Sequence, residues 1–190
     1  MIFSKDNVNR FCLLLYISMI IRSWFFKMEV YNYNIYCYIV SVYSFFDLWF
    51  RKLDMKIHHI ASICCALCGT LLRDNNYILT YDQDLYYRNI LQTILDVEVS
   101  SLFLTLVYLG YKNIIIRLLF AGTFIYFRIY KLTILVLNEN TNYFMEEYIC
   151  KDRFCISLWY LGIYTLTLLN WYWLYFIIEK AKKSIYKKNN

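Results

Sequence analysis

The chain contains no proline and only four glycines among its 190 residues. Its apolar stretches are therefore not interrupted by proline, the stronger of the two helix-breaking residue types. Such runs favour helices over a transmembrane β-barrel, which needs many short strands of alternating polarity. The sequence also lacks a visible domain boundary, internal repeat or low-complexity linker, so we expect a single helical bundle.

Histidine is almost absent, because the chain has only two, the adjacent His58 and His59. The sequence contains no Asn-x-Ser/Thr acceptor, so no N-linked glycan is expected. No small-residue cleavage site follows the first apolar segment, which argues against a secretory signal peptide there.

Apolar and aromatic side chains, by contrast, are in excess. Hydrophobic residues make up 61% of the sequence and aromatic residues 21%. One soluble domain of this length cannot bury so much apolar surface in its core. The net charge of +6 would fit a nucleic-acid binder, but the basic residues flank the apolar runs, as the positive-inside rule requires of a membrane protein. The composition therefore predicts an integral membrane protein with no nucleic-acid partner.

Six segments are long and apolar enough to cross, or nearly cross, a bilayer core of about 30 Å. We predict an all-α, multi-pass membrane helix bundle with three parts: a cytosolic N-terminus at 1–10, a transmembrane domain at 11–178 and a basic cytosolic tail at 179–190. The predicted spans are 11–26, 32–50, 56–72, 89–110, 114–137 and 155–178.

The distribution of charge predicts the orientation. With both termini cytosolic, the cytosolic segments hold eleven basic residues against five on the opposite side, where eight acidic residues also lie. This bias follows the positive-inside rule. Lys187 and Lys188 near the C-terminus occupy the positions of a dilysine retrieval signal. The alternative is that these lysines only contribute to a basic tail that enforces the topology.

Charged side chains also occur inside two predicted spans, where each costs roughly 2.5–3.5 kcal/mol to insert. Asp96 and Glu98 lie about 200° apart around a helix, so they cannot form a carboxylate pair, and Asp96 is expected to pair with Ser100. Arg117 and Arg128 are eleven residues apart in the next span and are expected on nearly the same face.

Two interpretations of these charges stay open. A Glu98–Arg128 ion pair across the bundle would neutralise two costly charges and would be purely structural. Alternatively, Glu98, Arg128 and Arg117 line a polar cavity that binds a lipid head group, with an arginine on its phosphate or carboxylate.

The histidine pair opens the third predicted span beside a basic loop. Asp54 lies four residues before His58 on one helical face, so its carboxylate is expected to orient that imidazole. A histidine held in this way, or its neighbour His59, is suited to general-base catalysis or to nucleophilic capture of an acyl group. The alternative is an interfacial pair that hydrogen-bonds head groups or a neighbouring helix.

The cysteines divide into two groups. Cys64, Cys65 and Cys68 diverge around their helix, so neither a metal site nor another cofactor is expected there. They are better explained as small side chains that pack a helix interface. Cys150 and Cys155 lie at the non-cytosolic end of the last loop, where an oxidising compartment would permit a disulfide.

Five short motifs stand out along the chain: YSFFD at 43–47, MKIHHI at 55–60, EVSSLFL at 98–104, FRIY at 127–130 and LNWYW at 169–173. In this order and spacing they resemble the TLC-domain family of membrane proteins, which includes translocating-chain-associated proteins, longevity-assurance proteins and ceramide synthases. The resemblance covers roughly residues 10–183.

The resemblance implies a lipid protein of the endoplasmic reticulum membrane and, by analogy with the ceramide synthases, an acyl-transfer role for the histidine pair. Those enzymes also carry a His-Asp-x-x-Asp stretch before the glutamate that aligns with Glu98. Here Ile90, Leu91 and Ile94 occupy these positions. The chain therefore resembles more closely the non-synthase members linked to phospholipid composition and membrane homeostasis.

Three functions follow as alternatives. The first is lipid homeostasis through binding of a membrane lipid or acyl chain. The second is an acyltransferase that uses the histidine pair to transfer an acyl group from acyl-CoA to an amine or hydroxyl lipid. The third is a non-catalytic role in trafficking or at the translocon. A homo- or hetero-oligomer is compatible with each of them.

Overall fold

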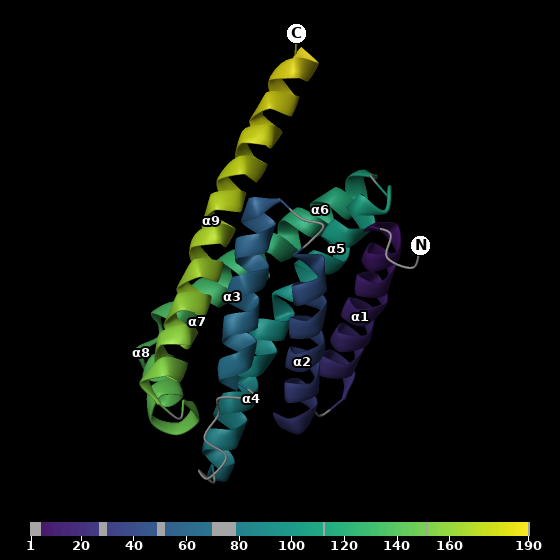
Figure 1. Ribbon diagram of the computed structural model, residues 1–190. Helices are drawn as coiled ribbons and strands as arrows, with labels where there is room; N and C mark the ends of the chain where they lie inside the picture. Colours follow the sequence, from purple (N-terminus) through teal and green to yellow (C-terminus); the bar gives the residue numbers. More distant parts are fainter. Residues whose placement is uncertain are drawn as a thin grey trace.

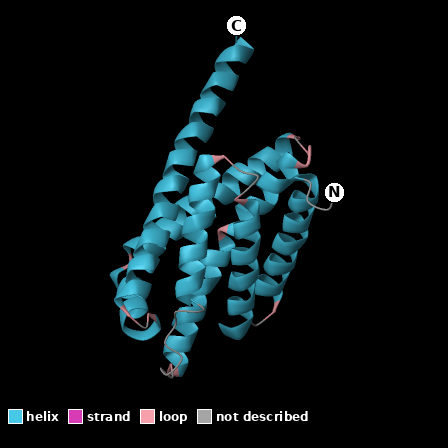
Figure 2. Cartoon of the chain, in the orientation of Figure 1, coloured by secondary structure: helices cyan, strands magenta, loops and turns pink. Residues whose placement is uncertain are grey.

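The structure is a computed structural model that describes residues 5–26, 30–48, 52–69, 79–111, 113–150 and 152–189, without the side chains of 5, 30–32, 69 and 184–189. These residues are almost entirely helical and contain no strand (Figure 2). The prediction of an all-α protein is therefore confirmed.

The helices join into six rods in the described part of the chain. Three rods are single helices near the N-terminus: α1 (Lys5–Phe25), α2 (Val30–Asp47) and α3 (Leu53–Gly69). The fourth rod consists of α4 (Tyr81–Asp96) and α5 (Glu98–Tyr108). The fifth consists of α6 (Ile114–Thr123), the π-helix η1 (Phe124–Lys131) and α7 (Leu132–Leu137). After the short α8 (Glu139–Phe144) and η2 (Met145–Ile149), the sixth rod is α9 (Arg153–Asn189).

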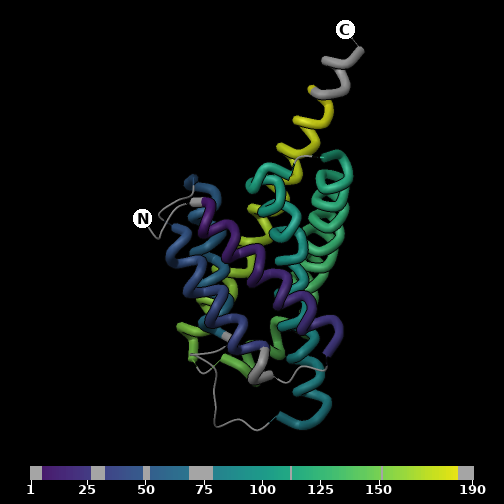
Figure 3. The backbone as a smooth tube through the Cα atoms, turned by 90° about the vertical axis from the view of Figure 1, so that its right-hand side faces the viewer, coloured from purple at the N-terminus to yellow at the C-terminus, as the bar shows by residue number. Residues whose placement is uncertain are grey.

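Successive rods run in opposite directions along the bundle (Figure 1). As a result, α1 begins at the same end of the bundle at which α9 finishes (Figure 1). The C-terminal part of α9 extends beyond the other helices, as the view turned by 90° also shows (Figure 3). The predicted tail at 179–190 is thus a continuation of this helix as far as Asn189.

Local sequence signals explain where several rods begin or bend. Thr80 caps α4 through a capping box, in which its hydroxyl accepts from the Gln83 amide and the Gln83 side chain accepts from the Thr80 amide. The side chain of Asn113 caps α6 by accepting from the Ile116 amide at 2.8 Å. Val97 keeps helical backbone angles between α4 and α5, so these two helices form one continuous rod.

Within the described residues, four helical stretches are long and apolar enough to cross a membrane: Asp6–Phe25, Tyr81–Tyr108, Ile114–Leu137 and Arg153–Lys183. They correspond to the first, fourth, fifth and sixth predicted spans, and the fifth agrees at both ends. The integral-membrane class is consistent with this finding. The second and third predicted spans are also helical, but α3 has only 17 residues and α2 is rich in tyrosine and asparagine.

Helices α3 and α9 pack closely against each other. Gly162 of α9 faces α3, where a Cβ atom would lie 2.7 Å from the Cys65 sulfur and 2.9 Å from the Ala61 carbonyl oxygen. On the outside of the bundle, large apolar side chains such as Leu14, Leu118 and Leu168 are exposed. A protein in water would bury such a surface, whereas acyl chains cover it in a bilayer.

Candidate functional site

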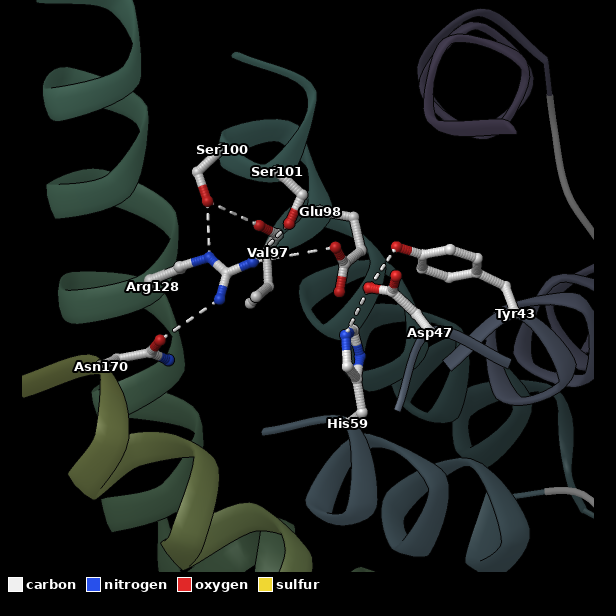
Figure 4. Close-up of polar contacts among 9 residues, drawn as sticks. All are labelled: Tyr43, Asp47, His59, Val97, Glu98, Ser100, Ser101, Arg128 and Asn170. Atoms are coloured by element: carbon white, nitrogen blue, oxygen red, sulfur yellow. Dashed lines mark hydrogen bonds and ion pairs between the residues drawn. The ribbon is translucent and has the colours of Figure 1, made fainter. Parts of the chain in front are cut away.

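Arg128 lies at the centre of the bundle and is only 4% exposed. Its Nε donates to Ser100 Oγ and its Nη2 to Ser101 Oγ, both at 2.5 Å (Figure 4). Its Nη1 donates to Asn170 Oδ1 at 3.3 Å, so that three rods, through α5, η1 and α9, hold one guanidinium group. A planar fork of five donors suits such a multidentate site, which the single ammonium of lysine would not fill.

Glu98 supplies the countercharge. Its Oε2 lies 3.7 Å from Arg128 Nη2, and both side chains are buried. The ion pair expected from the sequence is therefore present. The distance exceeds that of a hydrogen bond, so the guanidinium retains donor capacity for a further acceptor.

An open cavity of about 450 Å³ adjoins this arginine. Ser100, Ser101 and Arg128 line its inner part, and the exposed Lys52 and Lys180 lie at its mouth. Its walls are otherwise mostly apolar, with these side chains: Met55, Leu104, Tyr108, Phe120, Phe124, Trp173, Phe176 and Ile177. The only lining carboxylate among the described residues is Asp54, so three cations face one anion.

Arg117, the second arginine of the fifth rod, is exposed and does not line this cavity. The expectation that Arg117 and Arg128 share a face assumed an unbroken α-helix. The π-helical stretch η1 turns through a smaller angle per residue, so the register of the rod changes before Arg128. The structure therefore corrects the expectation of two neighbouring arginines.

A second cluster surrounds His59, which is buried together with Asp47 of α2. His59 Nε2 lies 2.9 Å from Asp47 Oδ2, and the Tyr43 hydroxyl donates to the same oxygen at 2.9 Å (Figure 4). A carboxylate in this position fixes the orientation and tautomer of the imidazole ring. The histidine that is held by an aspartate is thus His59, and its partner comes from another helix.

His58 is also buried, and its Nδ1 has no hydrogen-bond partner in the described part of the chain. The expectation that Asp54 orients His58 is wrong. Asp54 instead accepts from Trp173 Nε1 at 3.1 Å, and the Trp173 ring packs against His58 with a centroid separation of 5.3 Å. Helical spacing alone predicted a direct contact between Asp54 and His58. Both side chains instead contact the Trp173 indole of α9.

Next to His58 lies a small, mostly apolar cavity of about 50 Å³, which Glu98 and Ser62 also line. Trp173, which packs against His58, lines the larger cavity. Both histidines are thus buried among the helices, and His59 hydrogen-bonds a neighbouring helix, which was one of the alternatives expected from the sequence.

A third polar cluster centres on Asp96, for which sequence reasoning found no partner except Ser100. That expectation is wrong, because Ser100 donates to the Val97 carbonyl and accepts from the guanidinium. Asp96 Oδ2 instead pairs with Lys131 Nζ at 2.8 Å. Its Oδ1 accepts from Trp24 Nε1 at 3.0 Å and from Gln92 Nε2 at 2.7 Å. The available signal was Lys131, which lies three residues after Arg128 on the same rod.

The remaining predicted residues add little to these clusters. Among the described residues, no three His, Cys, Asp or Glu side chains converge in a way that could hold a metal ion. Lys187 and Lys188 lie on the last turns of α9, and their side chains fall outside the described part of the structure.

Comparison of the chain with models of protein families, with curated proteins and with solved structures found no match.

Proposed function

We propose that the protein is a multi-pass membrane protein of the TLC type that binds an anionic amphiphile, such as a phosphate-bearing lipid or a long-chain acyl-CoA, in lipid homeostasis. The observation that carries this function is the buried guanidinium of Arg128 beside an open cavity with two lysines at its mouth. An ionisable group at bilayer depth is costly and is generally retained for a function.

The charge of the cavity favours an anion. Of the charged side chains that line it, Arg128, Lys52 and Lys180 are cations and Asp54 is the one carboxylate among the described residues, while Glu98, the countercharge of Arg128, does not line the cavity. Phosphate and carboxylate groups accept the paired donors of a guanidinium with good geometry. The hydroxyls of Ser100 and Ser101 already hold this guanidinium in place, so little side-chain entropy is lost when a ligand binds.

The walls of the cavity favour a ligand with an apolar part. Aromatic and aliphatic side chains from α5, α6, η1 and α9 surround the polar base, as is typical of sites for amphiphilic small molecules. A head group would contact Lys52, Lys180 and Arg128, and its acyl chain would lie along the aromatic wall toward the exposed apolar surface.

For the membrane topology, we propose six crossings with both termini in the cytosol. The alternating rods support six crossings, with α2 and α3 as the two shorter ones (Figure 1). The positive-inside bias supports cytosolic termini. Lys52 at the start of α3 and Tyr108 at the end of α5 then place the cavity mouth on the cytosolic side, where acyl-CoA is available. The dilysine pair Lys187–Lys188 supports residence in the endoplasmic reticulum membrane.

The lysines at the cavity mouth provide a test that leaves the buried core intact. We expect Lys52→Gln/Lys180→Gln to weaken binding of a fluorescent palmitoyl-CoA to the purified protein in neutral detergent by about tenfold, because each lost exposed charge removes up to about 1 kcal/mol. The effect should shrink at high salt.

Lys183→Gln is the matched control, because Lys183 is exposed on the same helix but does not line the cavity. This variant should bind like the wild type. Equal affinities for wild type and Lys52→Gln/Lys180→Gln at low salt would refute the proposed anion site. Competition with phosphatidic acid and with coenzyme A alone shows whether the lipid or the coenzyme supplies the anion.

A second candidate function is acyl transfer, and the geometry of the histidines favours it over trafficking. His58 presents an unpartnered Nδ1 next to a cavity, while its neighbour His59 is held by Asp47. A free imidazole nitrogen can act as a base or an acyl acceptor. In this mechanism His58 would be the base or acyl acceptor, and His59 would be a positioning residue.

For this second candidate we expect His58→Gln to abolish the lipid change that the wild type produces when expressed in cells, as measured by lipidomics. Palmitoyl-CoA binding should be retained, because His58 does not line the larger cavity. The conservative His59→Asn should reduce the lipid change only in part. A lipid change that survives His58→Gln excludes the acyltransferase.

A further inference from the structure

Three cysteines meet at the end of the bundle opposite the cavity mouth. Cys68 belongs to the last turn of α3, Cys150 follows η2, and Cys155 lies in the first turn of α9. All three are buried, with exposed fractions of 0%, 9% and 0%. The function proposed above uses none of them.

Two of the sulfur atoms are in contact, and the third thiol lies against the backbone next to them. Cys155 Sγ lies 2.6 Å from Cys150 Sγ, and the Cys68 thiol donates to the Cys155 carbonyl oxygen at 3.2 Å. The Cys68 thiol therefore lies beside the first turn of α9, near the Cys150–Cys155 pair. The four other cysteines lie outside this group, and Cys64, four residues before Cys68, is only half-buried.

We propose that this cluster is a three-thiol exchange site, in which a disulfide alternates between a local Cys150–Cys155 bond and a Cys68–Cys155 bond that links α3 to α9. Three neighbouring thiols can form only one bond at a time, so one of them always remains as the attacking group for exchange. With the orientation proposed above, the cluster faces the non-cytosolic side, where disulfides persist.

The chemistry is balanced in two steps. In the first, the thiols of Cys150 and Cys155 exchange with the disulfide of an oxidised protein dithiol: one S–S bond forms here, and the carrier's S–S bond is reduced to two thiols. In the second, the Cys68 thiolate attacks the Cys155 sulfur. The Cys150–Cys155 bond breaks, and Cys150 leaves as a thiolate that takes up the proton released by Cys68. The second step needs no oxidant.

The two bonds would have different mechanical consequences. The local bond closes a loop between residues only five apart, whereas the Cys68–Cys155 bond joins residues 87 apart in sequence. Only the second bond ties α3, which carries both histidines, to α9, which carries Asn170 and Trp173. The position of the disulfide at one end of the bundle would therefore control how freely α3 and α9 separate along their contact.

Lys151 and Arg153 make the site well suited to peptide mapping, because trypsin cleaves between Cys150 and Cys155. Membranes that contain the full chain are acidified, alkylated with N-ethylmaleimide and digested without reduction. In the wild type we expect linked peptides that contain Cys150 and Cys155, and alkylated Cys64 as the internal control. In the Cys150→Ser variant we expect a Cys68–Cys155 link instead.

The outcomes separate the two parts of the proposal. Recovery of all three cysteines as alkylated thiols, both in fresh membranes and after treatment with diamide, overturns the disulfide site. A local bond in the wild type without any Cys68 link in Cys150→Ser overturns the exchange step. A Cys68→Ser variant should keep the Cys150–Cys155 link, because the local bond does not use Cys68, and recovery of Cys150 and Cys155 as alkylated thiols in this variant would overturn the local bond.

Discussion

Replacing Arg128 by glutamine is expected to destabilise the folded protein by about 3–5 kcal/mol, because it leaves the buried carboxylate of Glu98 without a countercharge. The variant also removes the guanidinium N–H groups that donate hydrogen bonds to Ser100, Ser101 and Asn170. Unfolding of the purified protein in detergent, followed by circular dichroism against denaturant concentration, measures the loss.

Two further variants separate the ion pair from the loss of hydrogen bonds. Glu98→Gln alone should also destabilise, since it leaves the guanidinium buried with neutral partners only. The double variant Glu98→Gln/Arg128→Gln should then lose less than the sum of the single losses, because no unpaired charge remains. Arg117→Gln is the control, since Arg117 is exposed, and should change stability by no more than about 0.5 kcal/mol. An Arg128→Gln protein as stable as this control contradicts the expected buried pair.

After Arg128→Gln, the substitution expected to destabilise the folded protein most is Gly162→Ala, although it adds a single methyl group. That Cβ would lie 2.7 Å from the Cys65 sulfur and 2.9 Å from the backbone oxygen of Ala61, which cannot move without shifting α3. Overpacking of this kind costs about 1–3 kcal/mol, and it would separate the two helices that carry His58 and Trp173. The same unfolding assay measures the effect.

Gly122 provides a matched control for the same substitution. It also lies within a helix, but nothing is within 4 Å of the Cβ that Gly122→Ala would add. Alanine has the higher helix propensity, so this variant should gain up to about 1 kcal/mol. The two substitutions thus have opposite expected signs. Equal effects at both positions would show that the contact between α3 and α9 is not close.

The polar interior shows which contacts sequence periodicity can predict. Glu98–Arg128 was predictable, because two opposite charges inside apolar spans must each find a partner. Asp47–His59 was not, because the partners belong to different helices, and spacing within one helix pointed only to a contact between Asp54 and His58. Asp54 instead accepts a hydrogen bond from the Trp173 indole, and the residue spacing within α3 gives no sign of this contact.

Arg117 illustrates a different limit. Counting 100° per residue places it near the face of Arg128, but the count holds only for an α-helix. The π-helical hydrogen bonding of Phe124–Lys131 changes the angle, and no proline or glycine within that stretch signals it. Such segments often occur at functional sites, and here the π-helix carries both Arg128 and Lys131.

Composition and apolar runs by themselves determined the all-α class, the membrane-like surface and the positions of the longest helices, because these properties depend on residues that are neighbours along the chain. Only the tertiary structure decided which polar groups meet. It pairs Asp96 with Lys131 and Asp47 with His59, leaves His58 Nδ1 open and gathers Cys68 with Cys150 and Cys155. These contacts join separate rods, so they depend on how each helix is rotated against the others, and side-chain packing fixes that rotation only in the assembled bundle.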